Sequence, residues 1–149
     1  MKKFLVALVA MFCVTAVSAQ VDNVGLRFNG DIEVVGQYDL SKANYIDGRI
    51  GFGKHHIGVT GIYTWKIQEF NWTPQYGKWF FDAGVGGNIV IGNDLGLNVV
   101  GSAKLGFKFN NAPVSLIWDY CPSLTLTEVA ADASRLNLWG GGVSIVYHF

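Results

Sequence analysis

The chain has 149 residues, of which half are apolar, 14% are aromatic and 19 are glycine, and its formal net charge is zero. Nine basic and eleven acidic side chains remain after Lys2 and Lys3 are set aside with the leader described below, a balance that excludes a strongly basic nucleic-acid-binding protein. The length suffices for one domain and not for two, and no nucleic-acid partner is expected.

The first nineteen residues have the pattern of a secretory signal peptide. A basic start is followed by an apolar run and by the small residues of 17–19, which are typical of a cleavage site. The apolar run is too short to cross a membrane as a helix. We therefore expect residues 1–19 to be a signal peptide and residues 20–149 to form the domain of an exported protein.

Residues 24–39 are compatible with one long strand or with a hairpin that turns at Asn29-Gly30, a strong hairpin signal. A two-residue turn would break the apolar face of this segment. A three-residue turn, Asn29-Gly30-Asp31, would instead place Phe28 opposite Ile32 and keep that face intact. The hairpin with the three-residue turn is the prediction.

The rest of the sequence alternates between apolar residues and polar or small residues with a period of two, which indicates β-strands. In Leu95–Phe109 the odd positions are apolar, whereas the even positions include Asn98 and Lys104. Further strands are predicted near residues 45–53, 56–68, 78–91, 95–109, 113–126 and 138–149.

Two architectures produce such alternation. A soluble sandwich or lipocalin-type barrel buries the apolar faces, whereas a transmembrane barrel turns them towards lipid. Here the second face combines many glycines with lysines and aspartates. A narrow lumen needs small residues where side chains crowd and charges that can pair, so this composition suits it better than a solvated surface. With both chain ends on one side, the strand number must be even. The sequence therefore predicts an all-β fold, an eight-stranded antiparallel up-and-down transmembrane β-barrel.

The connections divide between the two ends of this barrel. Those at residues 39–44, 69–78 and 110–113 would lie with the chain ends on the periplasmic side. Those at residues 29–31, 53–55, 92–94 and 127–137 would lie outside, and none is long enough for a large adhesive surface. Trp72, Tyr76 and Trp79 are predicted to belong to the periplasmic aromatic girdle.

The last predicted strand has an apolar face that ends in an aromatic residue. Val143, Ile145, Tyr147 and Phe149 share this face. The pattern resembles the signal by which outer-membrane barrels are recognised for insertion, so the barrel-assembly machinery is an expected partner.

Nine charged side chains are predicted to face the lumen. They are Arg27, Glu33, Asp47, Arg49, Lys66, Asp82, Lys104, Lys108 and Asp119. An eight-stranded barrel is only wide enough to be filled by its own side chains, and unpaired charges in such an interior are costly. We therefore expect these charges to form a paired network, with a proton or ion path as the functional alternative.

No catalytic residue, cofactor site or metal site is predicted. His148 lies about 13 Å from the nearest serine on its own strand face, which is too far for a nucleophile and its base. A cross-strand partner, Ser102 or Ser115, is left open. His55 and His56 occupy a short connection without nearby cysteines or carboxylates, and we interpret them as a solvated turn.

Four segments carry a family resemblance, and they are Gly25-Leu26-Arg27-Phe28, Asp82-Ala83-Gly84-Val85-Gly86, Asp119-Tyr120-Cys121-Pro122 and Tyr147-His148-Phe149. Through them the chain after residue 19 resembles the small outer-membrane barrels of the OmpX/OmpA-transmembrane-domain type. In that family the third segment often reads Asp-aromatic-Arg-Pro, and Cys121 stands here in place of the arginine. Cys121 is expected to pack beside Pro122 near the outer rim.

The resemblance implies a monomer in the outer membrane of a Gram-negative bacterium, with a structural, adhesive or stress-linked role and no catalytic residue. The expected function is that of a small pore-less outer-membrane β-barrel with a structural or surface-interaction role in the cell envelope. The alternatives are a barrel-embedded lipid-modifying enzyme, in which Ser, His and a carboxylate would converge, and a soluble periplasmic lipid-binding barrel.

Overall fold

The computed structural model describes residues 22–93, 95–127 and 136–149. The predicted signal peptide, residues 1–19, lies outside this range, as does most of the connection predicted at 127–137. The strands are β1 (Asn23–Phe28), β2 (Ile32–Asp39), β3 (Asn44–Phe52), β4 (Ile57–Phe70), β5 (Gly77–Ile91), β6 (Leu95–Phe109), β7 (Val114–Tyr120), β8 (Ser123–Thr125), β9 (Leu136–Asn137) and β10 (Gly141–His148). Within the described ranges, no helix has the length and apolar character needed to span a membrane.

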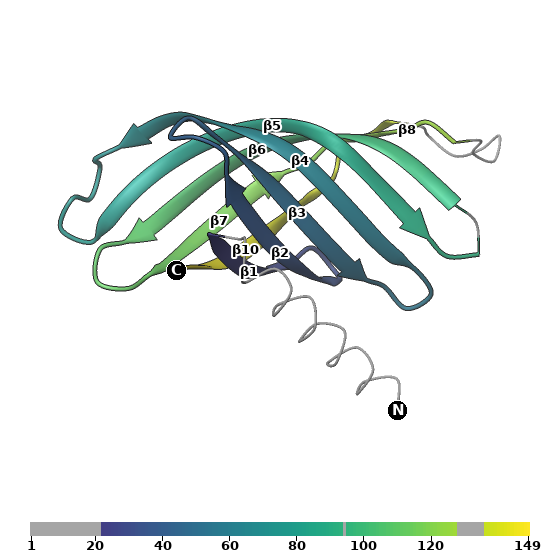
Figure 1. Cartoon of the computed structure of the whole chain (residues 1–149), viewed down its shortest axis with the longest axis horizontal. Coiled ribbons are helices and arrows are strands. Elements are labelled where there is room, and N and C mark those ends of the chain that lie inside the picture. The colour runs from purple at the N-terminus through teal and green to yellow at the C-terminus, as the bar shows by residue number, and fades with distance from the viewer. Residues whose placement is uncertain (1–21, 94, 128–135) are drawn as a thin grey trace.

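The strands close into a barrel (Figure 1). From β1 to β7 each strand pairs antiparallel with the next, β7 pairs with β10, and β10 pairs with β1. The short strands β8 and β9 continue the lines of β7 and β10, with β8 paired to β6 and β9 paired to β8. The ten strands thus make an eight-stranded up-and-down barrel, which confirms the predicted fold class.

The barrel has two distinct ends. We call the terminal end the one that carries Asn23, His148 and the turns at 40–43, 71–76 and 110–113, and we call the opposite one the far end. The terminal end lies towards the left of Figure 1, where the mark C stands. The wall is uneven around its circumference, because β4, β5 and β6 have 14 or 15 residues whereas β1 has only six.

The first hairpin has the predicted three-residue turn. Phe28 lies opposite Ile32 across the β1–β2 pair, so residues 29–31 form the loop. Gly30 has a φ of 101°, in the left-handed region that side chains with a Cβ rarely adopt. The hairpin interpretation of residues 24–39 is confirmed.

Two predicted strands are interrupted at the same height. The strand predicted at 113–126 divides into β7 and β8 at Cys121-Pro122, where proline has no N–H to donate to the ladder. The strand predicted at 138–149 pairs regularly with β7 only from Gly141 onward. The Cys121 amide donates to the carbonyl of Gly140 at 2.8 Å, which joins the two irregular stretches. Both predictions of unbroken strands are therefore wrong at these residues.

A register shift in β4 reverses its alternation near the terminal end. The shift against β5 lies between Lys66 and Gln68, as in a β-bulge. Beyond it, Glu69 is opposite Phe80 on the lumen side, and Phe70 is opposite Trp79 on the outer side. Strand β4 consequently extends two residues past the predicted 56–68 while its outer face remains aromatic.

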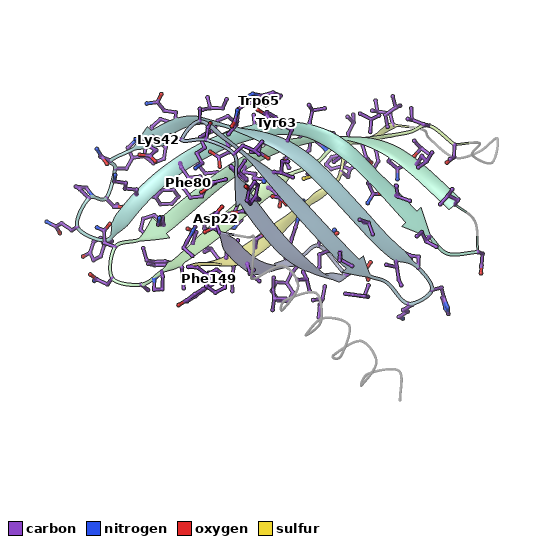
Figure 2. All side chains as sticks on the ribbon, viewed as in Figure 1. Asp22, Lys42, Tyr63, Trp65, Phe80 and Phe149 are labelled. Atoms are coloured by element: carbon purple, nitrogen blue, oxygen red, sulfur yellow. The ribbon has the colours of Figure 1, made fainter. Side chains whose placement is uncertain are left out.

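The distribution of polar and apolar side chains is the inverse of that in a soluble protein. Apolar side chains at outward positions are widely exposed, as in Leu26 (46%), Val85 (48%) and Ile145 (50%). Figure 2 shows Tyr63 and Trp65 projecting from the outer face of β4. The buried charged side chains are Arg27, Asp47, Arg49, Asp82, Lys104 and Asp119. The apolar faces thus point outward, opposite to what a soluble lipid-binding barrel requires.

Candidate functional site: the lumen and its terminal cavity

Six of the nine predicted charges lie in one chain of ion pairs across the lumen. It begins at Arg27 on β1, whose Nη1 atom lies 2.5 Å from Glu33 Oε2 on β2. The same guanidinium holds Asp119 on β7 through two parallel hydrogen bonds, Nε to Oδ2 and Nη2 to Oδ1, each 2.7 Å long. This bidentate pairing is the strongest geometry available to arginine and a carboxylate.

The chain continues through β3 to β6. Arg49 Nη2 lies 3.7 Å from Asp119 Oδ2, and Arg49 Nε donates to Asp47 Oδ1 at 3.0 Å. The ammonium group of Lys104 is paired with the other oxygen of Asp47. Three cations and three carboxylates, Glu33 included, therefore alternate along the chain, so that each buried charge has an opposite neighbour.

Tyr45 extends this chain towards the terminal end. The Lys104 ammonium donates to the Tyr45 hydroxyl at 3.3 Å and lies 5.0 Å from the centre of its ring. The hydroxyl in turn donates to Asp82 Oδ2 at 2.8 Å. Tyr45 is a lumen residue that was not predicted, although it shares its odd position on β3 with Asp47 and Arg49.

The remaining two predicted charges do not belong to this chain of ion pairs. Lys66 Nζ lies 3.3 Å from Asp39 Oδ1 near the terminal end, where both side chains are partly exposed. Lys108 also lies at that end and forms no ion pair within the described part of the molecule. The expectation of one network for all nine charges is therefore too broad, because these two lysines lie where solvent can reach the lumen.

Cys121 faces the lumen and contacts the ion-pair chain. Its Sγ atom lies 3.5 Å from both Arg49 Nη1 and Asp119 Oδ1 and 3.8 Å from Ser102 Oγ. This refines the position expected beside Pro122, because the thiol lies inside the lumen next to the Arg49 guanidinium. Ser102 thus contacts Cys121, whereas the described hydrogen-bond partners of His148 are Ser115 and Asn23.

A cavity of about 520 Å³ opens at the terminal end of the lumen. Around its mouth lie the partly or fully exposed Asp22, Lys42, Glu69, Lys108 and Phe149, of which Asp22, Lys42 and Phe149 are labelled in Figure 2. The deeper lining consists of the buried side chains of Tyr45, Asp82, Ser115 and Ile117, together with Phe80. The ring of Phe80 lies where a Cβ on Gly106 would be, so the glycine makes room for it.

Four polar side chains of the cavity wall form a hydrogen-bonded relay around the barrel. Ser115 Oγ lies 2.5 Å from His148 Nε2, and His148 Nδ1 lies 2.6 Å from Asn23 Oδ1. Asn23 Nδ2 donates to Gln37 Oε1 at 3.4 Å. Because an amide oxygen only accepts, the Nδ1 atom carries the proton, and in the neutral imidazole Nε2 then accepts from the serine. The relay joins β7, β10, β1 and β2.

This relay is the cross-strand contact that the sequence left open. Ser115 is the partner of His148, and the third member is the Asn23 amide rather than a carboxylate. An amide orients the imidazole but adds no negative charge to stabilise an imidazolium ion. Ser115 is also 0% exposed, so its hydroxyl is covered in this conformation.

The two histidines of the turn at 53–56 are at the far end, away from the cavity. Both are exposed, and His56 Nε2 lies 3.9 Å from Asp31 Oδ2. The described residues contain no group of three or more His, Cys, Asp or Glu side chains placed to hold a metal ion.

Aromatic rings form a continuous row on the outer wall near the terminal end. Consecutive ring centres, from Phe70 through Trp72, Trp79 and Phe107 to Phe109, are 4.6 to 5.7 Å apart. Of the three predicted girdle residues, Trp72 and Trp79 belong to this row. Tyr76 lies exposed in the 71–76 turn.

The residues of the predicted insertion signal lie along β10 and just beyond it. Val143, Ile145 and Tyr147 alternate with lumen-facing residues, and the rings of Tyr147 and Phe149 are 5.2 Å apart. The Phe149 amide donates to the Asp22 carbonyl at 3.1 Å, so this residue is held against the start of β1.

Within the described residues, the lumen therefore offers two environments: a middle filled by buried ion pairs, and a cavity at the terminal end. The first suits a rigid, filled barrel, and the second is large enough for a small ligand. Comparisons of the chain with protein-family models, curated proteins and solved structures found no match.

Proposed function

We propose that this protein is a small, monomeric, pore-less β-barrel of the outer membrane of a Gram-negative bacterium, with a structural or surface-interaction role in the envelope. The proposal includes the resemblance to barrels of the OmpX/OmpA-transmembrane-domain type and assembly by the barrel-insertion machinery. The observation that carries it is the inverted burial, with apolar side chains exposed on the wall and charged ones buried inside.

The outer wall supports a location in lipid. Large apolar side chains are exposed all along the strands of the wall. An extensive apolar surface is unfavourable in water and marks contact with membrane or protein. A closed barrel also satisfies its backbone hydrogen bonds without a free edge, as the hydrocarbon core requires. The aromatic row from Phe70 to Phe109 has the composition of an interfacial girdle, which supports placing the terminal end at a membrane interface.

The filled lumen supports a role without transport. The ion-pair chain from Glu33 to Lys104 crosses the interior, and ions could pass only if several buried pairs separated. The short connections described at the far end, at residues 29–31 and 53–56, offer little surface for a large partner. These features favour a structural role, or interaction with a partner through a small surface.

The test is fractionation of cells that express the full chain, followed by gel electrophoresis of the outer-membrane fraction with and without boiling. A folded barrel should be found there and migrate differently before and after heating. A variant lacking Phe149 should be depleted from this fraction, because it lacks the last residue of the insertion signal. Recovery of a soluble periplasmic protein without a heat shift would overturn the proposal.

A second candidate is a barrel-embedded hydrolase of acyl esters, favoured by the 2.5 Å contact of Ser115 with His148. In this reading Ser115 Oγ would attack an ester carbonyl and pass its proton to His148 Nε2. The imidazolium would return that proton to the alkoxide as the acyl–oxygen bond breaks, and water would then hydrolyse the acyl-serine. A fluorophosphonate probe distinguishes the two: covalent labelling that Ser115→Ala abolishes would support the enzyme. An unlabelled folded barrel leaves the relay as a structural connection between strands.

A further inference from the structure

The buried charges of the lumen balance with one exception. Along the ion-pair chain each carboxylate has a cation beside it, and the last pair is Asp47 with Lys104. Asp82 is 4% exposed and yet forms no ion pair with any described residue. Among the described residues, its only hydrogen-bond donor is the Tyr45 hydroxyl, at Oδ2. A buried carboxylate without a cation is costly, so this position attracts a positive charge.

The nearest lysines are engaged elsewhere. Lys104 is bound to Asp47, and Lys66, although directly opposite Asp82 in the β4–β5 pair, is paired with Asp39 at the mouth. Asp82 Oδ1 accepts no hydrogen bond from a described residue, and the side chain lines the terminal cavity. A ligand that enters from the mouth can therefore reach an anionic oxygen.

The rest of the cavity defines what such a ligand should look like. Three lysines and three other carboxylates in the lining cancel, so the excess negative charge resides on Asp82. Phe80 and Ile117 provide apolar surface beside it. The Tyr45 ring already has the ammonium groups of Lys104 and Lys66 at 5.0 and 5.7 Å from its centre. An ammonium group beside the Asp82 carboxylate gains a charge-assisted hydrogen bond, and a short apolar stem packs against Phe80 and Ile117.

We propose that the terminal cavity binds a primary ammonium group carried on a short apolar stem, with Asp82 as its anionic anchor and Phe80 and Ile117 against the stem. The ammonium donates to Asp82 Oδ1, the oxygen that the Tyr45 hydroxyl leaves free. The source of the group is either a small soluble amine or the ethanolamine headgroup of a lipid at the mouth, since both present the same chemistry. The inference goes beyond the proposed envelope role and does not depend on it.

The experiment is a titration of the full-length folded protein in dodecyl maltoside with butylammonium, followed through backbone amide NMR shifts. Saturable shifts should centre on Tyr45, Asp82 and Ile117, while butyrate and butanol at equal concentration should leave them unchanged. Asp82→Asn should weaken binding at least tenfold, because asparagine still accepts the Tyr45 bond but carries no charge. Binding of butyrate, or equal binding by Asp82→Asn, would refute the proposal.

Two further variants separate the site from general attraction by the mouth. Glu69→Gln removes an exposed carboxylate of the same cavity and should leave binding unchanged. Lys66→Gln removes the lysine that lies opposite Asp82 in the β4–β5 pair, and it should leave the affinity for butylammonium equal or higher. This variant therefore still tests the proposal if Asp82→Asn does not fold. Loss of binding in Lys66→Gln would contradict it.

The lipid source is tested in nanodiscs without added amine. If the headgroup is the ligand, discs that contain phosphatidylethanolamine should reproduce the shifts at Tyr45 and Asp82, and phosphatidylcholine discs should not. If the discs behave alike and only butylammonium produces the shifts, the ligand is a soluble amine. Absence of saturable shifts in every arm refutes the site itself.

Discussion

The Arg27 guanidinium and the Asp119 carboxylate are joined by two hydrogen bonds of 2.7 Å, although 92 positions separate the two residues in sequence. Both side chains are buried, and each has one further charged neighbour, Glu33 for the arginine and Arg49 for the aspartate. This pair therefore links the first hairpin to β7 inside the barrel, next to the seam where β10 lies between them.

Removal of this arginine should destabilise the barrel strongly. Arg27→Met leaves Asp119 and Glu33 without their shared cation, and breaking a buried pair from one side costs about 3–5 kcal/mol. The measurement is urea-induced unfolding in lipid vesicles, followed by tryptophan fluorescence. Lys108→Met is the control, since that lysine forms no ion pair among the described residues, and its change should stay within about 0.5 kcal/mol. Equal losses in both variants would argue against the ion-pair chain.

The relay at the terminal end should contribute less, but measurably. His148→Ala removes the hydrogen bonds to both Ser115 and Asn23 and leaves two polar groups unpaired, for an expected loss of about 1–3 kcal/mol. His55→Ala, in an exposed turn, should change the free energy of unfolding by no more than about 0.5 kcal/mol. The same unfolding assay measures both. A neutral His148 variant would show that the relay is not a stabilising contact.

Two glycines on the paired strands β4 and β5 should differ in how much an added methyl group lowers stability. A Cβ on Gly86 would overlap the carbonyl oxygen of Gly61 on β4, whereas a Cβ on Gly61 has nothing within 4 Å. Gly86→Ala is therefore expected to lower stability by about 1–3 kcal/mol through overpacking. Gly61→Ala should have little effect. The comparison is made by the temperature at which the unboiled band on a gel converts to the unfolded one.

Charges on the outer wall test the lipid location independently of fractionation. Ile145 lies outward in the middle of β10, and Ile145→Lys should cost about 2–4 kcal/mol if that position is at the bilayer midplane. Leu40→Lys, in the exposed 40–43 turn, should cost about 1 kcal/mol or less, as expected near the interface. Unfolding in vesicles measures both variants. If Ile145→Lys is as harmless as Leu40→Lys, the wall does not face lipid.

Much of the fold was predictable, because successive side chains of a strand point to opposite faces and the sequence therefore shows which residues share a face. The alternation alone placed Arg27 and Asp119 in the lumen and Ile145 outside. The spacing around Gly30 left a single strand and a hairpin open, and only the requirement for an even strand number favoured the hairpin. The β4 bulge was not predictable, because it depends on how Lys66 and Gln68 pair with a neighbouring strand. The break after Cys121 had a visible signal in Pro122, which ends ladder pairing wherever it occurs.

The candidate site was predicted less completely, for a related reason. Ser115 and His148 are 33 positions apart and meet only through the β7–β10 register, in which Ser115 lies opposite Val146. Distances along a single strand contain no information about such cross-strand neighbours. The position of Asp82 without a cation was likewise hidden, because its register partner Lys66 turns to Asp39 instead.

The seam between β1 and β10 has a consequence for how the chain folds. Asn23 and His148 are opposite each other across it, although 125 positions separate them in sequence. Among the eight longer strands, every other pairing except β7 with β10 joins strands that follow one another in the chain. Hairpins can therefore assemble locally, whereas ring closure must overcome the entropy of the longest loop in the molecule. We expect this final pairing to set the folding rate, so substitutions confined to the seam should slow folding more than those within β5 and β6.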